Sequence, residues 1–147
     1  MRSLILCLAV LSAAESAFAQ NGPKLEPCPM TEAQVATAAG MKVTKMVQHV
    51  SQWQGTQCDF TMENGEIQLM RVPPSARNLT TEAELAADFA AKEARRVLKD
   101  FPVPAYSFGG GLYVVTPKGV WSVLARRGPG GGLDPQKVAR ALIEKLR

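Results

Sequence analysis

Hydrophobic and polar positions alternate with two different periods along this chain, and the period changes at recognisable capping signals. Thr31 and Gln34 form a capping box that begins a helix of about two turns, and Gly40 ends it. From residue 41 to residue 72 the period is two, which predicts three strands. The Asn64-Gly65 dipeptide between the last two favours a hairpin with a type I′ turn, in which both central residues have positive φ.

A second helix and a second set of strands follow in the same order. Thr81 and Glu84 form another capping box, and apolar residues at steps of three and four predict a helix over residues 82–99 with its alanines facing the core. Residues 105–108, 112–116 and 120–125 have the pattern of strands, separated by turns that contain Gly or Pro. Beyond the glycine-rich stretch 128–132, Asp134 caps a terminal helix that Pro135 begins.

The predicted order is therefore α-βββ-α-βββ-α. Two three-stranded meanders with helices between and after them predict an α+β domain, in which the helices pack on one face of an antiparallel sheet. We expect a single domain over residues 31–147, preceded by an extended lead-in over residues 20–30.

The first 19 residues have the features of a signal peptide. Arg2 supplies the positive start, residues 4–11 form an apolar run, and Ala17-Phe18-Ala19 is a small-x-small cleavage pattern. Cleavage after Ala19 predicts a secreted, periplasmic or extracellular bacterial protein. The apolar run is too short to span a bilayer, so we expect no stable membrane insertion after cleavage.

Removal of that segment leaves two cysteines, Cys28 and Cys58. In an oxidising compartment they have only each other to pair with. The alternative is a thiol pair that binds metal or does redox work, but the spacing is far from the Cys-x-x-Cys of redox-active pairs. We predict a structural disulfide that closes a loop of about 31 residues and stabilises the fold by about 3–4 kcal/mol.

Composition and charge exclude two broad classes. Hydrophobic residues make up 46% of the chain and charged residues 20%, which excludes wholesale disorder. The net charge is +4, but the cations are scattered and no basic stripe is interleaved with aromatics. We therefore expect no nucleic-acid partner.

The residue inventory also argues against an enzyme. His49 is the only histidine, the cysteines are predicted to be paired, and no Gly-x-Ser-x-Gly motif is present. The sequence does not exclude a pair of catalytic carboxylates of the glycosidase type, because such a pair requires only two acids at the right distance in space.

One pair of residues is a candidate for metal binding: Met46 and His49, whose thioether and imidazole suit Cu(I). Positions 46 and 49 of a strand point to opposite faces, so we predict no metal site and no cofactor.

Three residues are candidates for partner contact. Trp53 is the aromatic residue of a polar stretch, and it is either an exposed binding anchor or a lid over the Cys28–Cys58 bridge. Arg126 and Arg127 either hold an anion or end a strand as solvated side chains.

Several short motifs resemble small secreted bacterial domains of unknown function, which are common among lipoproteins and sensor ectodomains. The motifs are the Cys28-Pro29-Met30-Thr31 opening with Val35, the Ala38-Ala39-Gly40 segment, and the strand cysteine in Cys58-Asp59-Phe60. The resemblance implies an α/β-sandwich core and a non-enzymatic role. We predict an exported binding module that contacts an envelope protein or cell-wall component. The alternative is a periplasmic protein that binds a small ligand or copper.

Overall fold

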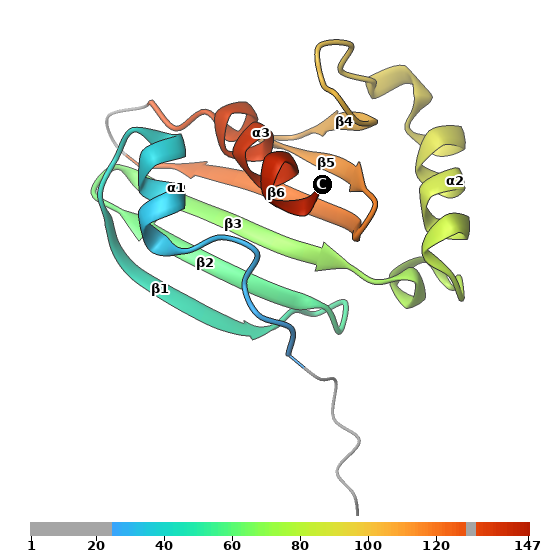
Figure 1. Cartoon of the computed structure of the whole chain (residues 1–147), viewed down its shortest axis with the longest axis horizontal. Coiled ribbons are helices and arrows are strands. Elements are labelled where there is room, and N and C mark those ends of the chain that lie inside the picture. The colour runs from blue at the N-terminus through green and yellow to red at the C-terminus, as the bar shows by residue number, and fades with distance from the viewer. Residues whose placement is uncertain (1–24, 129–131) are drawn as a thin grey trace, which may run out of the picture.

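The computed structural model describes residues 25–128 and 132–147 (Figure 1). The predicted signal peptide and the first residues of the lead-in lie outside these ranges. The element order is α-βββ-α-βββ-α, as predicted, with two 3-10 helices flanking the middle α-helix. The bounds are α1 (Glu32–Ala39), β1 (Val43–Val50), β2 (Thr56–Met62), β3 (Gly65–Val72), η1 (Pro74–Arg77), α2 (Glu82–Lys92), η2 (Ala94–Arg96), β4 (Ala105–Phe108), β5 (Gly111–Thr116), β6 (Gly119–Arg127) and α3 (Pro135–Leu146).

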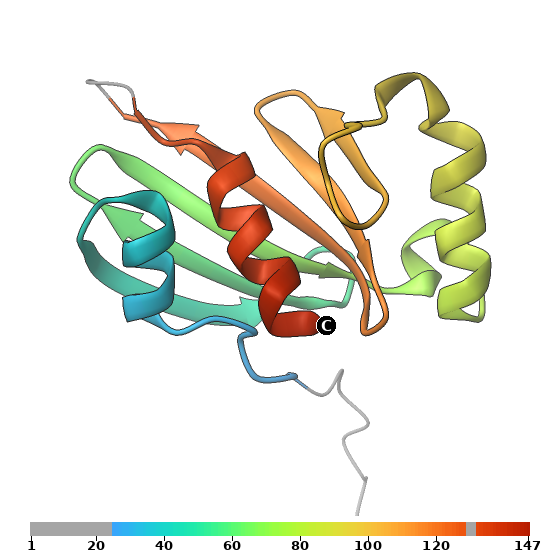
Figure 2. The same ribbon diagram turned by 45° about the horizontal axis from the view of Figure 1, so that its top comes forward.

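The six strands form one antiparallel sheet in the order β1-β2-β3-β6-β5-β4, which confirms the predicted α+β class. Each meander keeps its strands in sequence order, and the two meanders meet where β3 pairs with β6, from Gly65↔Arg127 to Val72↔Val120. This long central pairing makes the sheet continuous (Figure 2). Residues from both halves of the chain therefore share each face.

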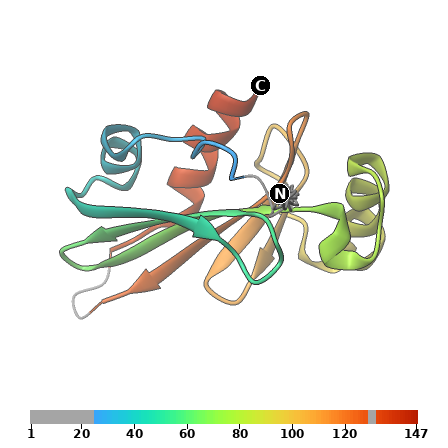
Figure 3. The same ribbon diagram turned by 90° about the horizontal axis from the view of Figure 1, so that it is seen from below.

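Helices α1 and α3 cover one face of the sheet, as expected (Figures 2 and 3). Both begin at the predicted caps: Thr31 and Gln34 complete a capping box, and the Asp134 carboxylate accepts a hydrogen bond from Gln136 N at 2.9 Å. Leu142 and Ile143 of α3 are fully buried in the main core. That core includes the inward residues of the strands, among them Phe60, Ile67, Leu69, Leu112 and Val123.

Helix α2 lies elsewhere, at one end of the sheet (Figure 1). Its Leu85 and Phe89 are fully buried in a second cluster with Val72, Tyr106 and Val120. In their strands these three residues alternate with residues of the main core, so they belong to the face opposite α1 and α3. The expectation that all helices pack on one face therefore holds for α1 and α3, and α2 closes one end of the other face.

The predicted extent of α2 was wrong. The helix ends at Lys92 instead of residue 99, because Val97 pairs with Tyr106 and Leu98 N donates to Ala105 O at 2.8 Å. The predicted alanine face was wrong too, since α2 buries Leu85 and Phe89. These larger side chains remove more apolar area from water than alanines do.

The hairpin between β2 and β3 is confirmed, but its predicted turn type was wrong. Met62 pairs with Gly65, so Glu63 and Asn64 are the two loop residues, and neither has a positive φ. Gly65 itself has φ +143°, and a Cβ built on it would overlap Arg126 O. The glycine permits close approach of β6, which the sequence motif did not indicate.

The predicted disulfide between Cys28 and Cys58 is confirmed, with 6.1 Å between the Cα atoms. It ties the lead-in to β2, where Cys58 is fully buried. Met30 is 2% exposed, and Glu26 N donates to Thr56 Oγ1 at 2.8 Å. The described part of the lead-in is therefore packed onto the domain. No helix within residues 25–128 and 132–147 is both long enough and apolar enough to cross a membrane.

Candidate functional site

The face of the sheet opposite α1 and α3 carries no helix over β1, β2 and β3 among the described residues (Figure 3). We call this surface the open face. Its alternating positions bring a row of residues together across five strands: His49 pairs with Gln57, Gln57 with Met70, Met70 with Ser122, and Ser122 with Tyr113. A groove of about 370 Å³ lies over this row.

The floor of the groove is mixed: Met70 and Leu124 contribute apolar side chains, and Gln57, Gln68 and Ser122 contribute polar ones. Gln57 and Gln68 are half-buried side chains of β2 and β3, and Ser122 of β6 is 3% exposed. Gln57 Nε2 donates to Asp59 Oδ1 at 2.8 Å, and Gln68 Nε2 donates to Glu66 Oε1 at 2.7 Å. Each bond uses one amide N–H. The carbonyl oxygens and the second N–H groups have no further protein partner within the described part of the chain.

Trp53 forms one wall of the groove, from the loop between β1 and β2. Ser51 holds this loop in shape: its N–H donates to Gly55 O at 2.8 Å, and its Oγ accepts from the N–H groups of Trp53 and Gly55, each at 3.2 Å. The indole packs against the second cluster, beside Val72 and α2. Trp53 is therefore a positioned, half-buried side chain at the edge of the groove.

Tyr113 and Phe108 also line the groove and form a second aromatic wall. Their rings stack with centroids 4.4 Å apart and an interplanar angle of 26°. Tyr113 also contacts Phe89 of α2, at 4.7 Å between centroids. Burial raises the pKa of the Tyr113 phenol, so its hydroxyl stays protonated and can donate a hydrogen bond.

Two basic side chains lie at the groove. His49, on edge strand β1, has 43% of its side chain exposed and places Nδ1 3.6 Å from Asp59 Oδ2. Arg126, on β6, is exposed and lines the groove. It makes no ion pair with the residues that the structure describes. Its cross-strand neighbour Glu66 accepts the Gln68 amide instead.

The structure brings together three of the residues singled out from the sequence: Trp53, Arg126 and His49 all line the groove. Trp53 is not a lid over the disulfide, because Cys58 belongs to the main core on the opposite face. The side chain of Arg127 lies outside the described part of the structure.

The candidate copper ligands Met46 and His49 do not come together, since Met46 packs against the main core while His49 lies on the open face. Within residues 25–128 and 132–147, no group of three or more His, Cys, Asp or Glu side chains is arranged to hold a metal ion.

Sequence reasoning missed the floor residues and Tyr113. The available signal was the polar alternation inside predicted strands, in which Gln57, Gln68 and Ser122 each sit between buried neighbours. A polar residue at such a position indicates the solvent side of a sheet.

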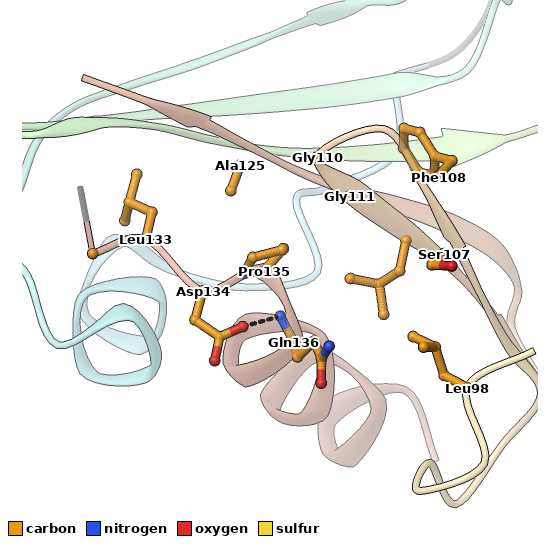
Figure 4. Close-up of a pocket in the computed structure, with 12 residues that line it drawn as sticks. Leu98, Ser107, Phe108, Gly110, Gly111, Ala125, Leu133, Asp134, Pro135 and Gln136 are labelled. Carbon is orange, nitrogen blue, oxygen red and sulfur yellow. Dashed lines mark hydrogen bonds between the residues drawn. The ribbon is translucent and has the colours of Figure 1, made fainter. Parts of the chain in front are cut away.

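A second cavity of about 650 Å³ lies on the helix-covered side, between the start of α3 and the β4–β5 turn (Figure 4). Leu98, Phe108 and Leu133 give it an apolar lining, and Gly110 and Gly111 form part of its wall. The Asp134 carboxylate at its rim is occupied in capping α3. Its lining residue Gly132 directly follows residues 129–131, which the structure does not describe, so we assign no site there.

No family model, no curated protein and no solved structure matches this chain. Function therefore has to be inferred from the geometry.

Proposed function

We propose that this chain is an exported, non-enzymatic binding module of the bacterial envelope, which holds an envelope component in the groove of the open face. In this proposal the chain is cut after Ala19 and works in the periplasm or outside the cell. The Cys28–Cys58 disulfide supports the proposal, because such bonds persist in oxidising compartments.

One observation carries the proposal: the groove combines aromatic side chains with polar groups on its floor, on a six-stranded sheet. Trp53 and Tyr113 both line it, and Gln57 and Gln68 on its floor have unused hydrogen-bonding groups. A concave surface of this kind, with a few convergent polar groups among aromatic side chains, is typical of binding sites.

A free small ligand is the second candidate, because a volume of about 370 Å³ lies within the range of small-molecule sites. Copper has no support from the geometry, since Met46 and His49 lie on opposite faces.

A pair of bulky variants tests the groove as the binding surface. Gln68→Trp fills the floor of the groove, and Lys137→Trp places the same side chain at an exposed position of α3, on the other side of the sheet. Purified wild type and both variants are incubated with a solubilised envelope fraction, and the bound material is measured. We expect Gln68→Trp alone to lose capture while melting normally. Equal capture by all three proteins contradicts the proposal.

A further inference from the structure

Building on the proposed function, we propose that the groove of the open face binds a carboxylate-bearing oligosaccharide of the cell-wall glycan. The inference rests on three features of the described residues: aromatic rings that line the groove, two side-chain amides on its floor, and one cation without an ion-pair partner. Each feature matches one part of such a sugar.

The aromatic walls match the apolar faces of sugar rings. A pyranose presents several C–H groups on one face, and these carry partial positive charge. The face of an aromatic ring carries negative charge from its quadrupole, so the two surfaces attract each other. Trp53 and the stacked pair Tyr113 and Phe108 offer such rings along the groove.

The floor matches sugar hydroxyls. A hydroxyl both donates and accepts hydrogen bonds, and so does a carboxamide, which has a carbonyl oxygen and two N–H groups. Gln57 and Gln68 each use one N–H within the sheet, at 2.8 and 2.7 Å. These bonds position the amides and leave one donor and one acceptor on each for a ligand.

Arg126 matches a carboxylate. Its guanidinium lies at the groove, is exposed, and has no ion pair with the described residues. A planar guanidinium binds a carboxylate through two parallel hydrogen bonds, which adds specificity as well as affinity. Among cell-wall sugars, muramic acid carries such a carboxylate on its lactyl group wherever the stem peptide has been removed.

A peptide fits this groove less well. Peptides that bind sheets add to an edge strand and pair with its free backbone groups. The floor residues lie on β2, β3 and β6, which are inner strands whose backbone groups are paired on both sides. The floor of the groove therefore offers a ligand side-chain groups and no free backbone edge.

Isothermal titration calorimetry tests the inference with a defined sugar. The probe is the disaccharide of N-acetylglucosamine and N-acetylmuramic acid with its lactyl carboxylate free, compared with the same disaccharide carrying a lactyl carboxamide. We expect Arg126→Gln to weaken binding of the acid about tenfold. The carboxamide should bind wild type about tenfold more weakly, with no further loss in Arg126→Gln.

Matched variants separate recognition from folding. Lys45 is an exposed cation on the same face but not at the groove, so Lys45→Gln should keep the wild-type affinity within about twofold. Trp53→Phe keeps an aromatic ring and should bind, whereas Trp53→Ala should lose about tenfold or more. The melting temperature of each variant is measured alongside.

Four outcomes overturn the inference. They are absence of binding to the disaccharide, equal binding of acid and carboxamide, binding of trigalacturonate (a carboxylate-bearing sugar that is not part of the cell-wall glycan) without binding of the disaccharide, and binding of an envelope-derived peptide in the groove without binding of the disaccharide. The last two leave the proposed function standing, because the groove still binds a ligand. If Gln68→Trp also captures envelope material as wild type does, the proposed function itself fails.

Discussion

The Arg77 guanidinium donates to Asp88 Oδ2 at 2.7 Å and lies 4.0 Å over the centre of the Phe89 ring. The same side chain reaches Glu93 at 3.3 Å. One residue of η1 thus contacts three residues in the last two turns of the α2 segment and holds them against the end of the sheet. Since Phe89 contacts Tyr113 and the second cluster includes Trp53, this contact also supports the walls of the groove.

Replacing Arg77 should loosen α2. Arg77→Met keeps an apolar stem over Phe89 and removes both ion pairs, and we expect the free energy of unfolding to fall by about 2 kcal/mol. The pKa of Asp88, which Lys92 and Arg77 hold below its usual value of 3.8, should rise in the variant. Urea denaturation and NMR titration measure the two effects. Arg95→Met, at an exposed position, should change stability by less than about 0.5 kcal/mol.

Glu84 should make stability depend on pH in a defined window. Its carboxylate accepts hydrogen bonds from Thr80 N, Thr80 Oγ1 and Thr81 N at 2.9, 2.8 and 2.9 Å. These bonds, led by that of the Thr80 backbone, lower its pKa from 4.5 to about 2. A lowered pKa in the folded state means that the ionised group stabilises the fold above pH 4.5 and that this contribution is lost as the pH falls toward 2.

Glu84→Gln keeps a neutral acceptor at the same place. We expect the variant to be less stable than wild type at pH 7 and the difference to shrink steadily below pH 4.5. Urea denaturation of both proteins at several pH values measures this. A difference that stays constant down to pH 2 would show that the charge of Glu84 does not contribute.

The Cys28–Cys58 bond should stabilise the fold without determining it. Its two cysteines are 30 residues apart, and we expect reduction to lower the free energy of unfolding by about 3–4 kcal/mol with the circular dichroism spectrum unchanged. Replacing both by Ala should give a similar loss. Alkylation without reductant followed by mass spectrometry should label neither cysteine, and two labelled thiols contradict the bond.

Gly119 should resist replacement, in contrast to Gly109. Gly119 has φ +111°, and a Cβ built there would overlap the Arg71 guanidinium. Gly119→Ala should therefore cost about 2 kcal/mol or more. Gly109 has an ordinary φ and nothing within 4 Å of a built Cβ, so Gly109→Ala should change stability by less than about 1 kcal/mol. Thermal denaturation of the two variants compares them directly.

Local signals in the sequence predicted most of the secondary structure, because capping boxes and strand alternation depend on neighbouring residues. Thr31, Thr81 and Asp134 begin helices where the capping pattern placed them. The end of α2 was missed because it depends on the pairing of Val97 with Tyr106, which no local pattern shows. The role of Gly65 was missed for the same reason, since it accommodates a carbonyl of β6.

The sequence indicated single residues of the candidate site but not that they lie together in one groove. Trp53 and Arg126 stood out as single residues, and His49 as the only histidine. Their meeting in one groove depends on the central pairing of β3 with β6, which joins the two halves of the sheet. That pairing is non-local, and the sequence order of the meanders is compatible with more than one strand order. The groove therefore became visible only in the folded chain.

The two tryptophans report on opposite faces, which allows one measurement to test the central claim. Trp53 borders the groove, whereas Trp121 is 4% exposed in the core beneath the helices. In an NMR titration of ¹⁵N-labelled protein with the muramic-acid disaccharide, the indole N–H signal of Trp53 and the side-chain amides of Gln57 and Gln68 should shift, while that of Trp121 stays in place. A shift of Trp121 without Trp53, or no shift at saturating sugar, would contradict binding at the open face.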